Sequence, residues 1–146
     1  MQRVREASVR AAGREVSRIG PGLLVLAGIA SNDAHDDLQW LAHKLIDLRI
    51  FDDDNGMMNR SVLDTGGAVL AVSQFTLYAS TRKGNRPSWS RAAAPDVAQP
   101  HFAAFVQLLA ERLGKPVPTG VFGAHMEVAL VNDGPVTIWL DSKARE

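Results

Sequence analysis

The sequence of 146 residues contains no cysteine, which excludes disulfide bonds, a thiolate nucleophile and a cysteine-ligated metal. It also lacks an apolar run of membrane-spanning length, and residues 1–6 carry charges where a signal peptide needs apolar side chains. Its 16 basic and 16 acidic side chains cancel, which argues against a protein that coats long stretches of nucleic acid. We therefore expect a cytoplasmic protein without a membrane segment.

Motifs for a metal or a nucleotide cofactor are missing as well. The four histidines, His35, His43, His101 and His125, do not have the spacing of a zinc site, and we expect them at the surface. The glycines at 20–22 are not followed by the lysine and hydroxyl residue of a phosphate-binding loop. The acidic run 52–56 lacks the terminal glutamate of a calcium loop and is typical of a turn. We expect no metal and no cofactor.

Apolar residues, in contrast, are plentiful and make up 46% of the sequence. This is enough for one core and a single domain over residues 1–146. Short alternating or apolar runs bounded by turn residues predict strands, and the run 23–29 is typical of a strand buried on both faces. The turn chemistry of 132–135 predicts a hairpin between the last two strands. The predicted strands are residues 4–9, 16–19, 23–29, 68–73, 126–131 and 136–140.

Two amphipathic helices are predicted from leucine and phenylalanine spacings of three and four. The first contains Leu38 to Leu48, with residues 31–33 supplying a capping oxygen. The second contains Phe102 to Leu113; because an internal proline deletes a helix hydrogen bond, we expect its regular part to start near Pro100. The strands and helices together predict an α+β domain with a largely antiparallel, curved or barrel-like sheet and two main helices.

Two segments have the polar content of a functional site. In Ser73–Thr76, two hydroxyls and an amide follow an apolar strand, either to tie down the strand end or to meet a ligand. In Asn132–Thr137, a glycine–proline pair lies between two apolar runs, either as an ordinary tight turn or as a functional one. A Gly-Pro peptide has an appreciable chance of being cis. Neither segment contains a recognisable nucleophile–base pair.

Together, in this order, the two segments resemble the motif pair Ser-Gln-x-Thr and Asn-x-Gly-Pro-x-Thr that marks the D-aminoacyl-tRNA deacylase family. Further similarity covers essentially the whole chain and runs through residues 2–4, 22–26, 49–51, 58–59, 74–77 and 86–88. The chain departs from the family pattern in starting a few residues later than many relatives and in carrying Pro100, and neither feature lies in the two motifs.

The resemblance implies a fold, an activity and an assembly. The family hydrolyses the ester between a D-amino acid, or glycine mischarged on alanine tRNA, and the 3′-terminal adenosine of tRNA. Its members are homodimers with the active site at the subunit interface. By this resemblance, Gly134-Pro135 of one subunit, with its peptide bond cis, enters the pocket of the other, and its backbone carbonyls exclude L side chains.

The resemblance also implies roles for individual residues. Ser73, Gln74, Phe75 and Thr76 would line the catalytic pocket, with backbone N–H groups stabilising the oxyanion and the RNA 2′-hydroxyl assisting attack by water. Thr76 would be a nucleophile by residue type, but the sequence shows no base to activate it. Arg3 would brace the pocket, and Asn132 and Thr137 would belong with Gly134 and Pro135 to the segment that rejects L-amino acids.

Two alternatives remain open on the sequence. The first is a non-catalytic dimeric nucleic-acid-binding protein with the same fold, against which the neutral charge counts. The second is the related deacylase that removes an L-amino acid; the intact Ser73-Gln74 pair favours the D-specific type. The basic loop from Arg82 to Arg91 is either a solvated surface loop or a guide for the acceptor end of tRNA.

Overall fold

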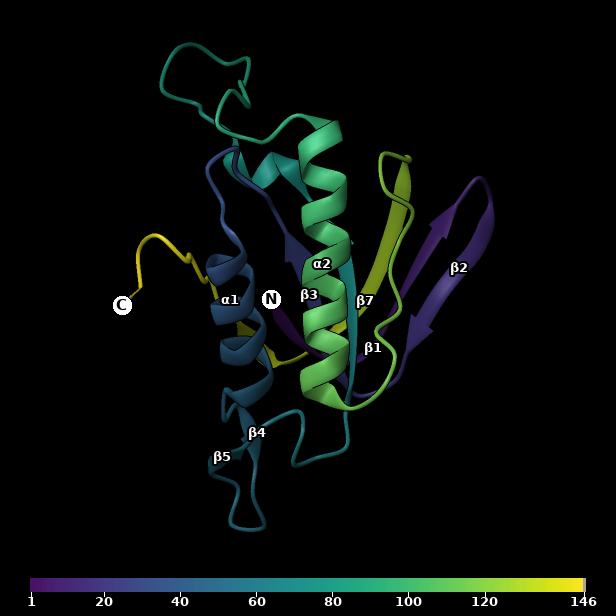
Figure 1. The fold of residues 1–146 in the computed structure, drawn as a ribbon. Coiled ribbons are helices and arrows are strands. Elements are labelled where there is room, and N and C mark those ends of the chain that lie inside the picture. Colours follow the sequence, from purple (N-terminus) through teal and green to yellow (C-terminus); the bar gives the residue numbers. More distant parts are fainter. Residues whose placement is uncertain (146) are drawn as a thin grey trace.

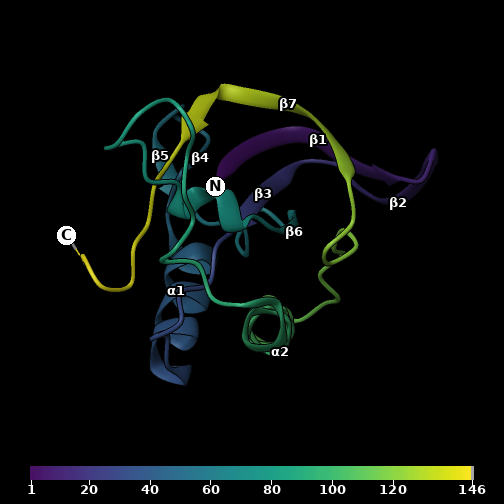
Figure 2. The ribbon, with the colours of Figure 1, turned by 90° about the horizontal axis from the view of Figure 1, so that it is seen from above.

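Strand β1 (Gln2–Ala11) organises the sheet, because it is hydrogen-bonded to three other strands. Along one edge it runs antiparallel to β7 (Met126–Thr137). Along the other edge its first residues pair with β3 (Gly22–Ala27) and its last residues with β2 (Arg14–Ile19). Figure 2 shows the result in the computed structural model, in which β7, β1 and β2 arch over β3. The structure describes residues 1–145, and Glu146 of the predicted domain lies outside the described residues.

Strands β3 and β6 (Ala68–Ser73) form a middle layer and run parallel to each other. The chain between them contains α1 (His35–Asp47) and the small hairpin of β4 (Phe51–Asp52) and β5 (Met58–Arg60). Adjacent side chains of β3 enter different cores: Leu23 belongs to the core on the helix side, and Leu24 to the core that β1 and β2 cover. The prediction of a strand buried on both faces is thus confirmed, as is a curved, largely antiparallel sheet.

Both predicted helices are present and cover one side of the middle layer (Figure 1). The second, α2 (Pro95–Leu113), starts a turn earlier than predicted, so the start near Pro100 was wrong. Pro95 occupies the first helical position, where a missing N–H costs little. Pro100 lies inside the helix and costs about 3 kcal/mol. The turn before it still forms, because the Ala98 N–H donates to the Ala94 carbonyl oxygen at 2.8 Å. Within residues 1–145, neither helix is long and apolar enough to cross a bilayer.

The predicted C-terminal hairpin is also wrong, because residues 126–137 form the single strand β7. Strand β1 is long enough to pair with residues on both sides of the glycine–proline segment. Gln2 pairs with Thr137 and Val4 pairs with Asn132, so β7 carries extra residues over this interval and bulges. Proline is compatible with a bulge because it cannot donate a hydrogen bond to the ladder.

The cap of α1 differs from the prediction, because none of residues 31–33 supplies it. The N-cap residue is Ala34, and its N–H donates to Asp37 Oδ2 at 2.9 Å. The same carboxylate receives a hydrogen bond from Lys143, and Arg145 lies 3.8 Å from its Oδ1. Asp37 is buried, and the Lys143 hydrogen bond, followed by the Ala34 hydrogen bond, lowers its pKa. One carboxylate therefore fixes the helix start and the C-terminal segment together.

We predict that Asp37→Asn lowers the free energy of unfolding by about 1 kcal/mol at neutral pH, the usual magnitude for a lost helix cap. Because the folded-state pKa of Asp37 is lowered, its contribution is fully present above the ordinary value of 3.8 and is lost as the pH falls through the folded pKa. Urea unfolding at a series of pH values should show the wild-type and variant curves converging below pH 3.8.

Asp36→Asn is the matched control, since Asp36 lies in the same first turn of α1 but is exposed. It should leave both the stability and its pH dependence close to wild type. A constant gap between Asp37→Asn and wild type down to the acid transition would contradict the role given to the carboxylate.

Candidate functional site

The polar segment Ser73–Thr76 begins where β6 ends. Ser73 pairs with Ala27 of β3, and the N–H of Gln74 donates to the Ala27 carbonyl oxygen at 2.8 Å. The chain then turns into the short 3-10 helix η1 (Phe75–Tyr78). The position of the segment is therefore set by the parallel pairing of β3 with β6, whose apolar side chains are buried.

One hydrogen bond within the segment joins two of the predicted site side chains. Gln74 Nε2 donates to Thr76 Oγ1, so each restricts the other. The N–H groups of Phe75 and Thr76 donate to no other group within residues 1–145, as is usual at the start of a helix. The Phe75 ring is 57% exposed. The segment thus presents two free backbone donors and an accessible aromatic ring next to an oriented amide.

A cavity of about 210 Å³ is lined on one side by Leu77 and Tyr78 of η1. Most of its other lining is apolar and comes from β3, α1 and the segment 138–142. Gly28 allows η1 to pack closely here, because a Cβ at this residue would lie 3.1 Å from the Gln74 carbonyl oxygen. Burial, followed by the charges of nearby carboxylates, raises the pKa of Tyr78. Among the predicted site residues, Thr137 lines this cavity.

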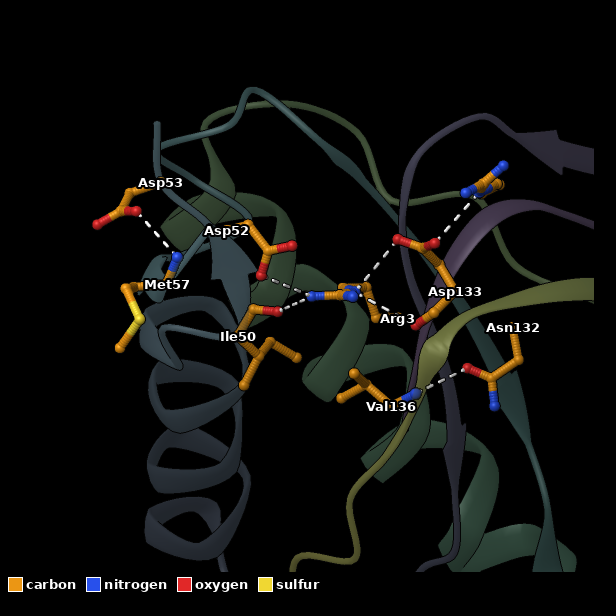
Figure 3. A network of polar contacts seen from close by, with 9 residues as sticks. Arg3, Ile50, Asp52, Asp53, Met57, Asn132, Asp133 and Val136 are labelled. Carbon is orange, nitrogen blue, oxygen red and sulfur yellow. Dashed lines mark hydrogen bonds and ion pairs between the residues drawn. The ribbon is translucent and has the colours of Figure 1, made fainter. Parts of the chain in front are cut away.

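Arg3 is the buried charge of the second half of the site, with 7% of its surface exposed. Its Nη1 donates to the Ile50 carbonyl oxygen at 2.6 Å, and its Nε donates to the Asp133 carbonyl oxygen at 3.3 Å. Its guanidinium also lies 3.6 Å from the Asp52 carboxylate and 3.3 Å from that of Asp133. Figure 3 shows Arg3 between the Ile50–Asp52 segment and Asp133. Partners of this kind are what a buried cation requires.

The segment Asn132–Thr137 is held in its bulge by its own first and last side chains. Asn132 Nδ2 donates to Thr137 Oγ1 at 3.0 Å, and the Val136 N–H donates to Asn132 Oδ1 at 3.3 Å. The Gly134-Pro135 peptide between them is cis, and both residues are exposed. Gly134 has a φ of +121°. The glycine–proline pair is therefore presented outward on a base that Asn132 and Thr137 close.

The structure joins some predicted site residues and separates others. Arg3, Asn132, Gly134 and Thr137 meet at the bulge. Ser73–Thr76 lies at the other end of the middle layer: Arg3 pairs with Leu23, whereas Ser73 pairs with Ala27. At about 3.3 Å per residue, these two β3 partners, Leu23 and Ala27, are about 13 Å apart along the strand. Within residues 1–145, no hydrogen bond or ion pair joins the two halves.

Asp133 is a site residue that the motif did not single out. Its carboxylate accepts from Arg5 Nε at 3.1 Å and lies beside Arg3, and its carbonyl oxygen accepts from Arg3. The available signal was the pair Arg3 and Arg5, which project from the same face of a strand because side chains alternate. Two cations on one face predict a nearby carboxylate, although not which one.

The predicted surface position of the histidines is largely confirmed. His35, His43 and His125 are exposed, and His101 is half-buried with Nδ1 2.9 Å from the Val97 carbonyl oxygen. None of them takes part in the contacts of either half of the site within residues 1–145.

Fold and site together match one family of proteins. A model of the D-Tyr-tRNA(Tyr) deacylase family matches residues 1–141, and the chain belongs to this family. The D-aminoacyl-tRNA deacylase of Dechloromonas aromatica is 62% identical over 100% of this chain and 97% of its own length. That of Parabacteroides distasonis is 57% identical over 99% of this chain and 97% of its own.

Solved structures with this fold carry two different descriptions. A c-Myc DNA unwinding element binding protein superposes with a TM-score of 0.91 at 40% identity, covering 98% of this chain and 97% of that one. A probable eukaryotic D-amino acid tRNA deacylase superposes with a TM-score of 0.75 at 18% identity, covering 92% of each chain. The second likeness shows the fold alone.

We predict that Gly134→Ala is destabilised by about 1–3 kcal/mol, the usual magnitude for a strained backbone. The new Cβ would lie 2.9 Å from Val136 Cγ2 and 3.2 Å from Arg3 Nη2, at a φ that side chains rarely adopt. Gly13→Ala is the control, because its φ is also positive but nothing lies within 4 Å. Thermal unfolding should show a clearly larger loss for Gly134→Ala; equal losses would mean that the bulge is not closely packed.

Proposed function

We propose that this protein hydrolyses the ester that joins a D-amino acid to the 3′-terminal adenosine of tRNA. The observation that carries the proposal is membership of the deacylase family over residues 1–141, with both motif segments intact and presented at the ends of the middle layer. Relatives at 62% and 57% identity are named D-aminoacyl-tRNA deacylase. We place the reaction in the cytoplasm, where tRNA is charged.

A homodimer completes the site in this proposal. In one chain, Ser73–Thr76 and Gly134-Pro135 lie near opposite ends of β3, which supports a site whose two halves come from different subunits. Gly134 and Pro135 are exposed and can enter a neighbouring pocket. Leu130 and Val131 of β7 are 38% and 46% exposed, which supplies apolar surface for a contact. A two-fold arrangement then forms two identical sites.

Selection for D-amino acids follows from exclusion in this arrangement. The carbonyl oxygens of Gly134 and Pro135 from the partner subunit would lie against the α-carbon of the bound amino acid and occupy the space that an L side chain needs. Backbone groups do not distinguish one side chain from another. The site therefore accepts many D-amino acids, and also glycine mischarged on alanine tRNA, which has no side chain to exclude.

Hydrolysis is assigned to the other half of the site. Water attacks the ester carbonyl carbon with help from the 2′-hydroxyl of the terminal adenosine, and the bond to the ribose oxygen breaks. The free N–H groups of Phe75 and Thr76 are the nearest candidates to stabilise the oxyanion. The Thr76 hydroxyl already accepts from Gln74 Nε2, which suits a positioning role for both side chains.

A second candidate function is nucleic-acid binding without catalysis, which the structure described as a c-Myc DNA unwinding element binding protein favours. The related deacylase for L-amino acids is a further alternative, and the intact Ser73-Gln74 pair counts against it. Stereospecific turnover distinguishes all three, because only the D-specific enzyme releases a D-amino acid and spares its L-enantiomer.

We predict that the purified protein releases D-tyrosine from D-tyrosyl-tRNA faster than L-tyrosine from the L-ester by roughly 100-fold or more, since an excluded side chain prevents productive binding. Release of free amino acid over time, with both substrates prepared on the same tRNA, is the measurement. Equal rates would contradict exclusion, and turnover of the L-ester alone would assign the L-specific activity.

Thr76→Ala separates water attack from covalent catalysis in the same assay. If Thr76 only positions Gln74, the variant should retain activity within roughly tenfold of wild type. Complete loss of turnover in a folded Thr76→Ala protein, together with a trapped aminoacyl-enzyme in the wild type, would establish Thr76 as a nucleophile instead.

We also predict that the two halves of a site act between subunits. Gln74→Ala should lose hydrolysis, whereas Pro135→Ala should keep hydrolysis and lose the rejection of the L-ester. In a mixed dimer, the site that keeps Gln74 then receives the native Gly134-Pro135 of the other chain. After dissociation and random reassociation of equal amounts, turnover of the L-ester should fall from about half to about a quarter of that of Pro135→Ala alone. Turnover of the L-ester that stays at half would show that both halves of a site come from one chain.

A further inference from the structure

A loop between Ser80 and Ser88 projects beyond the helices and the sheet, as the teal segment at the top of Figure 1 shows. Two backbone hydrogen bonds close its base: the Ser80 N–H donates to Ser88 at 2.7 Å, and the Ser88 N–H donates to Ser80 at 3.1 Å. The loop starts two residues after η1, which itself contains Phe75 and Thr76 of the site segment. It is therefore an anchored projection next to one half of the proposed site.

This loop has a net positive charge, whereas the rest of the protein has a net negative charge. No acidic residue occurs between Asp64 and Asp96, while the same stretch contains Arg82, Lys83, Arg86 and Arg91. The whole chain has equal numbers of acidic and basic side chains, so the remainder of the molecule is net acidic. All four basic residues are exposed, and none forms an ion pair within residues 1–145. Unpaired cations grouped in this way attract phosphates.

Two exposed aromatic rings connect the basic loop to the site. Phe75 and Trp89 stand edge to face, with ring centroids 5.6 Å apart and an interplanar angle of 74°. Their side chains are 57% and 37% exposed. The backbone around Trp89 is anchored: the Ala92 N–H donates to the Trp89 carbonyl oxygen at 3.0 Å, and the Ala93 N–H donates to the Ile29 carbonyl oxygen at 2.9 Å. The two rings therefore pack on each other from an anchored backbone.

Unpaired nucleotides bind to surfaces of this composition, because bases stack on aromatic rings while basic side chains neutralise the phosphates. A paired duplex keeps its bases inside the stack and cannot use the rings. We propose that Trp89, supported by Phe75, stacks an unpaired nucleotide that precedes the terminal adenosine of the substrate, and that Arg82, Lys83 and Arg86 hold the adjoining phosphates. The identity of the RNA rests on the proposed function, whereas the binding mode does not.

The test uses uncharged RNA, so that binding is measured without catalysis. Two RNA hairpins share one stem; one has a single-stranded 3′ end that terminates in adenosine, and the other is blunt. Dissociation constants are measured by fluorescence anisotropy at several salt concentrations. Trp89→Ala should weaken binding of the first hairpin by about fivefold or more and leave the blunt hairpin unchanged, while Trp89→Phe, which keeps a ring, should bind nearly as wild type.

The charge of the loop is tested with the triple variant Arg82→Ala/Lys83→Ala/Arg86→Ala. It should reduce the slope of log affinity against log salt by about 2 to 3. The matched control Arg14→Ala/Lys44→Ala/Arg49→Ala removes three exposed cations from other parts of the surface and should leave the slope unchanged. Equal effects of the two triples, or equal effects of Trp89→Ala on both hairpins, would overturn the proposal.

The outcomes also separate this inference from the proposed function. If the wild-type protein hydrolyses D-aminoacyl esters but the loop and Trp89 variants bind both hairpins as tightly as wild type, the docking surface is wrong and the activity stands. If overhang-dependent binding is lost in the variants while the wild-type protein hydrolyses no ester, the surface stands and the activity is wrong. Circular dichroism of every variant confirms that differences in binding do not reflect unfolding.

Discussion

The buried guanidinium of Arg3 is the interaction on which the arrangement of the site depends. A buried cation without partners costs several kcal/mol, so the groups that surround it are held in place by that cost. Its partners come from separate parts of the chain: the Ile50 carbonyl and the Asp52 carboxylate on one side, and Asp133 on the other. The first strand, the segment after α1 and the bulge of β7 are thereby fixed to one another.

This constraint gives the bulge its unusual combination of rigidity and exposure. Asp133 is fixed from beneath by Arg3, and the bond between Asn132 and Thr137 closes the base. Gly134 and Pro135, in contrast, remain exposed. At the far end of the buried layer, Ser73–Thr76 is positioned by the parallel pairing of β3 with β6. One chain therefore carries an exposed element and a separate polar segment, which is the arrangement that the proposed two-fold contact would use.

The sequence predicted those parts of the fold that depend on local patterns. Residues 68–73 and the leucine spacing of α1 were identified correctly because apolar periodicity reports directly on burial. The hairpin at 132–135 was wrong because its turn chemistry is also that of a bulge, and only pairing with the long strand β1 decides between them. The start of α2 was wrong because Pro95 suits the first helical position and the Ala98 N–H bonds to the Ala94 carbonyl oxygen, so that Pro100 weakens the helix without delaying its start.

The site shows the same limit more strongly. Its motif residues were predicted from the resemblance, but the contact of Asp133 with Arg3 was not, because it spans 130 positions of sequence and no local pattern encodes it. The net charge of zero also does not reveal that residues 65–95 contain no acidic side chain.

That segregation of charge reconciles a neutral protein with an RNA substrate. A large basic surface would bind any phosphate backbone. The protein would then reach a terminal ester only as fast as it dissociates from the rest of the nucleic acid. In the proposed docking mode, a small cationic loop beside exposed rings, on a molecule that is otherwise net acidic, attracts one end of an RNA and repels its body. The neutral composition is thus consistent with an enzyme that acts at a terminus, and in the proposed dimer exclusion by backbone carbonyls would select the amino acid by its chirality.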